Sequence, residues 1–163
     1  MNELEVHDVP DAVEPEGWRL VVDGRVDRRV VLTPDELRSM ALVTVAGEFS
    51  CVEGWTAPDL TWRGVGIADL LARARPGRDA EFALVRAMDG EYACGFPIDR
   101  LSEALLAIEL DGEALPVEHG GPARLVPADE SDCWESVKWV ARIELRADRP
   151  DDTARDLALS RIE

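Results

Sequence analysis

Asp-Gly pairs divide this chain into short apolar segments. The pairs at 23–24, 89–90 and 111–112 each follow an apolar run, and another apolar run comes after each of the first two. Asp-Gly is typical of tight turns, because glycine adopts the positive φ angles that many turns need. The pattern predicts hairpins over residues 18–32 and 81–96, and a strand over 105–110 that ends in a turn. Such a chain folds mainly as short strands.

Helix signals are fewer and weaker. Thr33 followed by Pro34, Asp35 and Glu36 supplies an N-cap, an N1 proline and first-turn acids, which predicts a helix over 34–40. Apolar residues at helical spacing predict a second helix over 67–74, and Pro97 opens a third over about 98–104. The acidic tail carries a weak helical pattern over 153–162.

Further strands are predicted over 43–50, 123–127 and 136–146, the last alternating cleanly between apolar and polar residues. The intervening segment is predicted to be a loop, because it carries several turn-forming residues: Gly54, Pro58, Gly64 and Gly66. We therefore expect an α+β fold in a single domain, a mixed β-sheet or partial barrel with short helices. The domain is predicted to span residues 18–146, between an acidic N-terminal extension (1–17) and an acidic C-terminal tail (147–163).

The charge balance limits the partners. The 163 residues include 34 acidic and 18 basic residues, with a formal net charge of −16, and the basic residues are all arginine except Lys138. Such a surface repels nucleic acids and anionic membranes, and no apolar run reaches the roughly 18 residues of a membrane span. Residues 1–17 do not resemble a secretory signal, so a cytoplasmic protein is expected. The acidity fits either a halophilic protein in a high-salt cytosol or a moderately acidic protein from a GC-rich genome.

Cys51, in the segment FSCVEGWT, is the first candidate site residue. Three cysteines without CxxC spacing argue against a disulfide framework or a structural zinc site. A lone cysteine is often an inert apolar side chain. Cys51, however, follows a predicted strand and precedes a glycine-bearing loop, a position from which a rigid element presents a side chain to a pocket. Its thiolate would suit a soft metal or act as a nucleophile.

Two further segments carry candidate anion-binding groups. In PVEHGGPARLV (116–126), His119 and Arg124 flank a Gly-Gly-Pro turn, which is either an ordinary irregular turn or an anion site made of exposed backbone amides, an imidazole and a guanidinium. In SVKW (136–139), Lys138 has survived in a chain that otherwise uses arginine, by chance or because its role needs a compact point charge. Ser136 beside it offers a hydroxyl or an N–H group.

Taken together, these segments resemble the sulfite-oxidase-type molybdopterin oxidoreductases, closest to the branch of the periplasmic protein-methionine-sulfoxide reductase catalytic subunit. The resemblance runs from about Trp18 to Leu145 and rests on three motifs in the family's order: WRLVVDGRVDRRVVLTPDEL, FSCVEGW, and LDGEALPVEHGGPARLV followed by SVKWVARIEL. It implies the sulfite-oxidase-like fold and a Mo-molybdopterin cofactor. It also implies that Cys51 is the molybdenum ligand and catalytic residue, and that five residues contact the cofactor: His119, Arg124, Ser136, Val137 and Lys138.

The resemblance implies oxygen-atom transfer on a small-molecule substrate, such as an S- or N-oxide. Sulfite and nitrate are disfavoured, because Val52-Glu53-Gly54-Trp55-Thr56 replaces the Ala-Gly-Asn-Arg-Arg type run that helps those relatives bind an oxyanion. No second redox centre is evident, so a separate electron donor or acceptor protein is expected. Two alternatives stay open at this point: a non-catalytic or cofactor-poor domain of the same fold that acts in binding or assembly, and a thiol enzyme that uses Cys51 without metal.

Overall fold

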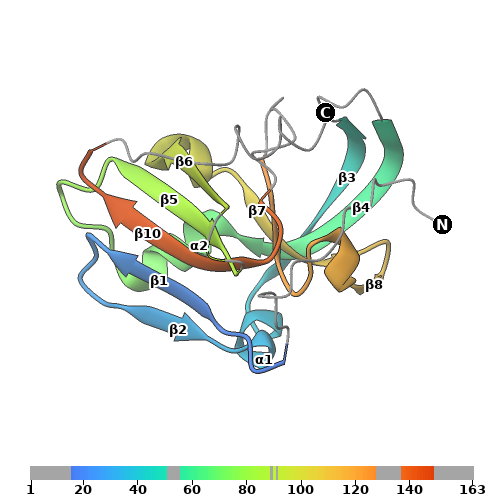
Figure 1. The fold of residues 1–163 in the computed structure, drawn as a ribbon, viewed down its shortest axis with the longest axis horizontal. Coiled ribbons are helices and arrows are strands. Elements are labelled where there is room, and N and C mark those ends of the chain that lie inside the picture. The colour runs from blue at the N-terminus through green and yellow to red at the C-terminus, as the bar shows by residue number, and fades with distance from the viewer. Residues whose placement is uncertain (1–15, 51–55, 89, 91, 128–136, 149–163) are drawn as a thin grey trace.

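The short strands of the chain pair into two sheets (Figure 1). A computed structural model describes residues 16–50, 56–88, 90, 92–127 and 137–148. The first sheet has the order β2 (Val30–Leu32), β1 (Leu20–Gly24), β10 (Val140–Arg146), β5 (Phe82–Ala87), β6 (Ala93–Pro97). The second has the order β3 (Leu42–Ser50), β4 (Thr56–Gly66), β7 (Leu105–Leu110), β8 (Glu113–Ala114), and β9 (Arg124–Val126) also pairs with β7. The helices are α1 (Pro34–Arg38), α2 (Ile67–Ala74), α3 (Ile98–Leu101) and the 3₁₀ turn η1 (Val117–His119).

The first sheet joins the two ends of the domain. β1 pairs with β10 in parallel, with Val22 opposite Ile143, whereas the other pairs in this sheet are antiparallel. Across the parallel pair, Arg142 Nε donates a hydrogen bond of 2.8 Å to Asp23 Oδ1. In the described part of the chain neither sheet closes into a barrel. The predicted α+β fold of mixed sheets with short helices in one domain is therefore confirmed.

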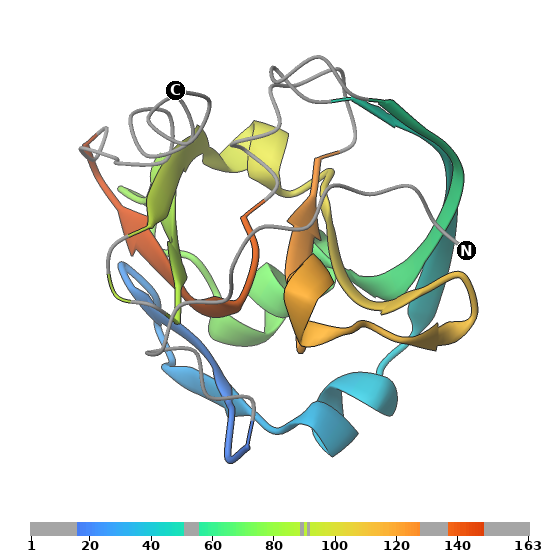
Figure 2. The same ribbon diagram turned by 45° about the vertical axis from the view of Figure 1, so that its right-hand side comes forward.

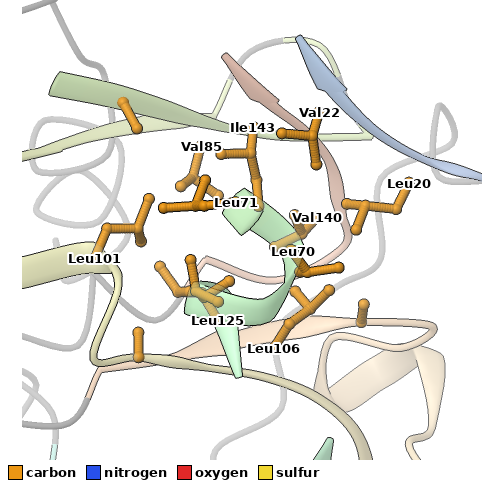
Figure 3. Packing of buried hydrophobic residues seen from close by; sticks show 14 of the residues in the cluster. Leu20, Val22, Leu70, Leu71, Val85, Leu101, Leu106, Leu125, Val140 and Ile143 are labelled. Carbon is orange, nitrogen blue, oxygen red and sulfur yellow. The ribbon is translucent and has the colours of Figure 1, made fainter. Parts of the chain in front are cut away.

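The main core contains buried side chains of α2 and of strands from both sheets (Figure 3). Ile67, Leu70, Leu71 and Ala74 form one buried face of α2, which explains why this short helix is stable where it lies. Leu70 and Leu71 point toward side chains of several strands: Val85, Leu106, Leu125, Val140 and Ile143. Burying a leucine contributes about 1.5–3 kcal/mol, so this face alone stabilises the helix by several kcal/mol. The longest described helix, α2, has eight residues, and no described helix has the length and apolarity of a membrane span.

Most of the predicted elements are confirmed. Thr33 begins α1 with a capping box, in which its hydroxyl accepts from Glu36 N while the Glu36 carboxylate accepts from Thr33 N. β5 and β6 form the predicted second hairpin, and α2 has the predicted bounds. α3 is shorter than predicted and ends at Leu101. The weak helical pattern over 153–162 lies outside the described residues.

The segment predicted to be a loop after Cys51 is largely a strand, so that prediction is wrong. Residues 56–66 form β4, which pairs with both β3 and β7. Gly64 marks a register shift in β4, and a Cβ there would overlap the Leu106 carbonyl oxygen of β7. The glycine therefore permits close strand contact at a bulge and does not mark a turn. The prediction that Lys138 lies within the strand 136–146 is also wrong: Lys138 lies in a bend before β10.

Candidate functional site

The segment 116–122, called the His119 turn below, connects β8 to β9. It contains η1, Gly120 at φ 108° and a cis Gly121–Pro122 bond. His119 N and Gly121 N donate to Pro116 O at 3.0 and 2.9 Å, and Gly120 N donates to Val117 O at 3.1 Å. The backbone amides of residues 119–121 thus bond carbonyls of the turn itself. Of the two alternatives for this segment, exposed amides for anion binding do not agree with these bonds, which leaves the side chains as the candidate donors.

The His119 turn brings Arg124 and Lys138 together. A Cβ added to Gly120 would lie 3.1 Å from Arg124 Cδ and 3.0 Å from Lys138 Cγ. Two backbone hydrogen bonds fix the segment of Lys138 beside the turn and β9: Trp139 N donates to Gly120 O and Leu125 N donates to Val137 O, both at 2.9 Å. Figure 2 shows β9 next to the start of β10, where these segments meet. Lys138 is thus brought next to His119 and Arg124, and the three predicted site residues form one cluster.

Arg124 is the buried member of this cluster and bonds the His119 turn. Its residue is only 3% exposed, its Nη1 donates a 3.0 Å hydrogen bond to His119 O, and its guanidinium lies 5.4 Å from the centre of the Trp62 ring. Burial lowers the pKa of Arg124 from its ordinary value to about 10, so the side chain is still a cation at neutral pH. Arg124 therefore supplies a buried positive charge and binds the carbonyl side of the His119 turn.

His119 contributes a buried ring nitrogen, Nδ1, that is available to a ligand. The residue is 9% exposed, and its Nδ1 is buried without a hydrogen-bond partner in the described part of the protein. Burial lowers the pKa of His119 below 6.5, and the charges of Lys138 and Arg124 lower it further, against a smaller opposing effect of Glu118. The imidazole is consequently neutral at neutral pH. An unsatisfied buried nitrogen is costly, so this atom is poised to accept or donate a hydrogen bond.

Lys138 and Val137 contribute differently to the cluster. Lys138 Nζ is buried and lies 5.7 Å from the centre of the Trp139 ring. Val137 is fully buried in the main core, and its carbonyl accepts the hydrogen bond from Leu125 N. A contact of Val137 with a cofactor would therefore involve its backbone, whereas Lys138 offers a charged side chain.

The other predicted site residues are not part of the described structure. Cys51 and Ser136 lie outside the described residues, Cys51 in the segment 51–55 that links β3 to β4 and Ser136 directly before Val137. Within the described ranges, no group of three His, Cys, Asp or Glu side chains is arranged to hold a metal ion. Cys94 is buried in β6. The predicted metal ligation by Cys51 stays a prediction.

Sequence reasoning did not find Trp62, which lies under the Arg124 guanidinium. Trp62 belongs to β4, and a single buried tryptophan in an apolar cluster shows no signal that separates it from ordinary core. Trp139 directly follows Lys138, and its indole Nε1 donates a 2.6 Å hydrogen bond to Val117 O of the His119 turn.

Comparison with known proteins identifies the family. A family profile described as "Oxidoreductase molybdopterin binding domain" matches residues 6–154. The chain belongs to this molybdopterin-binding oxidoreductase family. The resemblance predicted from the sequence is thus confirmed, together with its Mo-molybdopterin cofactor and its class as a molybdenum-dependent oxidoreductase.

Several relatives support the assignment. The chain is 32% identical over 143 residues to the "Uncharacterized oxidoreductase YuiH" of Bacillus subtilis, covering 86% of this chain and 71% of the relative. It is 29% identical over 170 residues to the "Protein-methionine-sulfoxide reductase catalytic subunit MsrP" of Pseudomonas syringae, covering 90% of this chain and 49% of MsrP. The MsrP of Campylobacter jejuni is 24% identical over 156 residues, covering 85% of this chain and 52% of the relative. The chain thus spans about half the length of these two MsrP proteins.

The fold is similar to that of a solved relative. The crystal structure of the sulfane dehydrogenase SoxCD from Paracoccus pantotrophus matches with a TM-score of 0.79 at 24% identity, over 86% of this chain and 41% of that one. This likeness shows the sulfite-oxidase-like fold. His119 and Arg124 suit the family's cofactor chemically. The buried guanidinium of Arg124 and the His119 Nδ1, which has no hydrogen-bond partner in the described residues, are partners for phosphate oxygens and pterin heteroatoms.

Proposed function

We propose that this protein transfers an oxygen atom to or from a small substrate, using molybdenum held by the Cys51 thiolate and a pterin held by His119, Arg124, Ser136, Val137 and Lys138. The observation that carries the proposal is the convergence of His119, Arg124 and Lys138 around Gly120. Sequence separations of 5 and 19 residues between His119 and the other two are closed by backbone hydrogen bonds between the His119 turn, β9 and the start of β10.

Each residue has a defined role in this proposal. Lys138 presents a compact ammonium to the terminal phosphate of the pterin, and His119 forms a hydrogen bond to the cofactor through its neutral imidazole. Arg124 keeps the His119 turn in place through its hydrogen bond to His119 O and adds a buried positive charge. A thiolate from Cys51 suits molybdenum because both are soft. The bound cofactor supplies two-electron oxygen-atom chemistry, while the chain binds and orients it.

An S-oxide is the substrate class that we favour. The five residues after Cys51 contain no basic side chain, in contrast to the run that sulfite and nitrate enzymes use to hold an oxyanion. Two relatives are named as protein-methionine-sulfoxide reductase subunits, which supports sulfoxide reduction. In that direction the S–O bond breaks, and the oxygen leaves as water with two protons and two electrons. The electrons come from a separate donor protein in our proposal.

Metal analysis tests the proposal directly. Protein purified from a molybdenum-replete host should carry about one molybdenum per chain and release a fluorescent pterin on denaturation. Cys51→Ser should lose the metal and the activity with methionine sulfoxide under a reduced dye donor. Cys94→Ala is the matched control, because it removes a buried thiol from β6 and should retain metal.

Wild-type protein without metal and pterin from such a host would falsify the proposed function and favour a non-catalytic domain. Metal retained by Cys51→Ser would instead exclude the cysteine as ligand. Activity that survives this substitution without metal in either protein would exclude molybdenum chemistry altogether. Reduction of nitrate or oxidation of sulfite at rates above those with S- or N-oxides would contradict the proposed substrate class.

The setting that we propose is a cytoplasm of high salt. The chain carries 34 acidic against 18 basic residues, and dense carboxylates keep a protein hydrated in concentrated salt. Unfolding by urea at increasing KCl concentrations tests this: stability should rise with KCl. Full stability at low KCl would contradict the halophilic interpretation and favour the compositional one.

A further inference from the structure

Trp139 has a backbone conformation that a core-filling residue does not need. Its φ angle is 56°, in the left-handed region, where bulky residues other than glycine are rare. Such a conformation costs energy and persists only where the surroundings determine it strongly. Trp139 is 3% exposed, yet burial alone does not explain the strain, because a tryptophan in an ordinary extended backbone would also fill space.

Three hydrogen bonds hold Trp139 in this conformation. Its amide N donates to Gly120 O at 2.9 Å and its indole Nε1 donates to Val117 O at 2.6 Å. Trp139 therefore bonds the His119 turn at two positions, at the start of η1 and directly after it. Its own carbonyl accepts from Met88 N at 2.7 Å, which ties it to the end of β5. The main chain and side chain of Trp139 thus connect the His119 turn with the end of β5.

The strained residue directly follows Lys138 and determines where that side chain begins. Lys138 Cβ and Cγ lie 3.1 and 3.0 Å from the position of a Gly120 Cβ, and Lys138 Nζ lies 5.7 Å from the Trp139 ring centre. Rotation of the Trp139 backbone to negative φ would break the bond to Gly120 O and move Lys138 away from the turn.

We propose that Trp139 is a positioning residue that holds the Lys138 ammonium against the His119 turn. The importance of this arrangement for cofactor binding rests on the proposed function, whereas the arrangement itself does not. Trp139 touches no reacting atom in this proposal. It acts through Lys138 and His119, whose relative position it determines.

The test compares Trp139→Phe with Trp18→Phe. Trp18 is a matched control, because it is 5% exposed and its Nε1 also donates to a backbone carbonyl, Val140 O, at 2.9 Å. Both variants lose one indole hydrogen bond and similar buried volume, so we expect similar losses of thermal stability. Only Trp139→Phe should retain the pterin less well, by about tenfold in its dissociation during dialysis.

A second readout needs no cofactor. The chain has two histidines, His7 and His119, so NMR of ¹⁵N-labelled imidazoles resolves the titration of His119 in cofactor-free protein. The charge of Lys138 lowers the pKa of His119, and Arg124 and Glu118 are the other charged groups that act on it. Lys138→Met should therefore raise the pKa of His119. Trp139→Phe should raise it in the same direction, and adding Trp139→Phe to Lys138→Met should have little further effect.

A His119 pKa in Trp139→Phe equal to that of the wild type and of Trp18→Phe would overturn the proposal. A raised pKa with unchanged pterin retention would support the positioning role and contradict the assignment of Lys138 to the cofactor. If Trp139→Phe does not fold, benzothienylalanine at position 139 keeps the ring volume and removes only the Nε1 donor. The same shift of the His119 pKa is then expected, and its absence would again refute the role.

Discussion

Gly120→Ala tests whether the site depends on the close contact of the His119 turn with Lys138 and Arg124. Gly120 has φ 108° and ψ 5°, a backbone conformation that L side chains rarely adopt. The added methyl group would also meet Lys138 Cγ at 3.0 Å, and both Lys138 Cβ and Arg124 Cδ at 3.1 Å. The substitution therefore has two separate costs, one in the backbone and one in packing.

The magnitude follows from these two costs. A residue with a Cβ in a sparsely populated region of φ and ψ costs about 1–3 kcal/mol. Forcing an additional carbon into a well-packed site costs about another 1–3 kcal/mol, because the side chains of Lys138 and Arg124 must move by a few tenths of an ångström. We expect a loss of about 2–6 kcal/mol in the free energy of unfolding.

Gly112→Ala is the matched control for the backbone cost. Gly112 has φ 87°, but a Cβ there would meet no atom within 4 Å. The entropy that alanine removes from the unfolded chain is the same in both variants and cancels in the comparison. Urea unfolding should therefore show Gly120→Ala to be less stable than Gly112→Ala by about 1–3 kcal/mol. Pterin content per chain should fall only in Gly120→Ala.

Equal losses of stability in the two glycine variants would refute the reasoning, because they would show that the contacts around Gly120 relax without cost. Normal pterin content in a clearly destabilised Gly120→Ala would refute the second half of it. The cluster would then be a structural feature of the turn and not a part of the cofactor site.

Three further substitutions probe the same region and one remote element. His119→Gln should flatten the pH dependence of unfolding below pH 6.5: the pKa of His119 is lowered in the folded state, so the unfolded state takes up a proton first and stability falls as the pH decreases through that window. An unchanged slope would contradict this. Arg124→Met should change the free energy of unfolding by less than about 2 kcal/mol, because the cost of burying its charge offsets its hydrogen bond and ring contact. Pterin retention should nevertheless drop, and a larger loss of stability would show that the buried charge is net stabilising. Thr33→Ala should cost about 1 kcal/mol through the lost capping box of α1, with unchanged pterin content and recovery in Thr33→Ser.

Several elements could be predicted from the sequence because their signals are local. Residues within a few positions of one another form the capping box of α1, the apolar face of α2 and the Asp-Gly turns between strands. Gly64 shows where this reasoning fails. A glycine that serves a bulge beside Leu106 has the same sequence signature as a glycine in a turn, and only strand pairing distinguishes the two.

Some features of the candidate site could likewise be predicted from the sequence, and others could not. The sequence alone singled out His119, Arg124 and Lys138, because residue type and the rarity of lysine carry chemical information. It also led to the correct family, since three motifs appear in the family's order. It could not show that the amides of the His119 turn bond within the turn, or that Arg124 is buried against Trp62.

Those features were decided by tertiary structure, because they depend on contacts between segments far apart in the chain. Arg124 lies in β9, which pairs with β7, and from there its guanidinium bonds His119 O. Trp139 takes its strained conformation because both the His119 turn and the end of β5 form hydrogen bonds with it. The sequence by itself determined which groups are available for an anionic cofactor. Tertiary structure determined that three of these groups lie together and that Arg124 and Trp139 hold the His119 turn by hydrogen bonds.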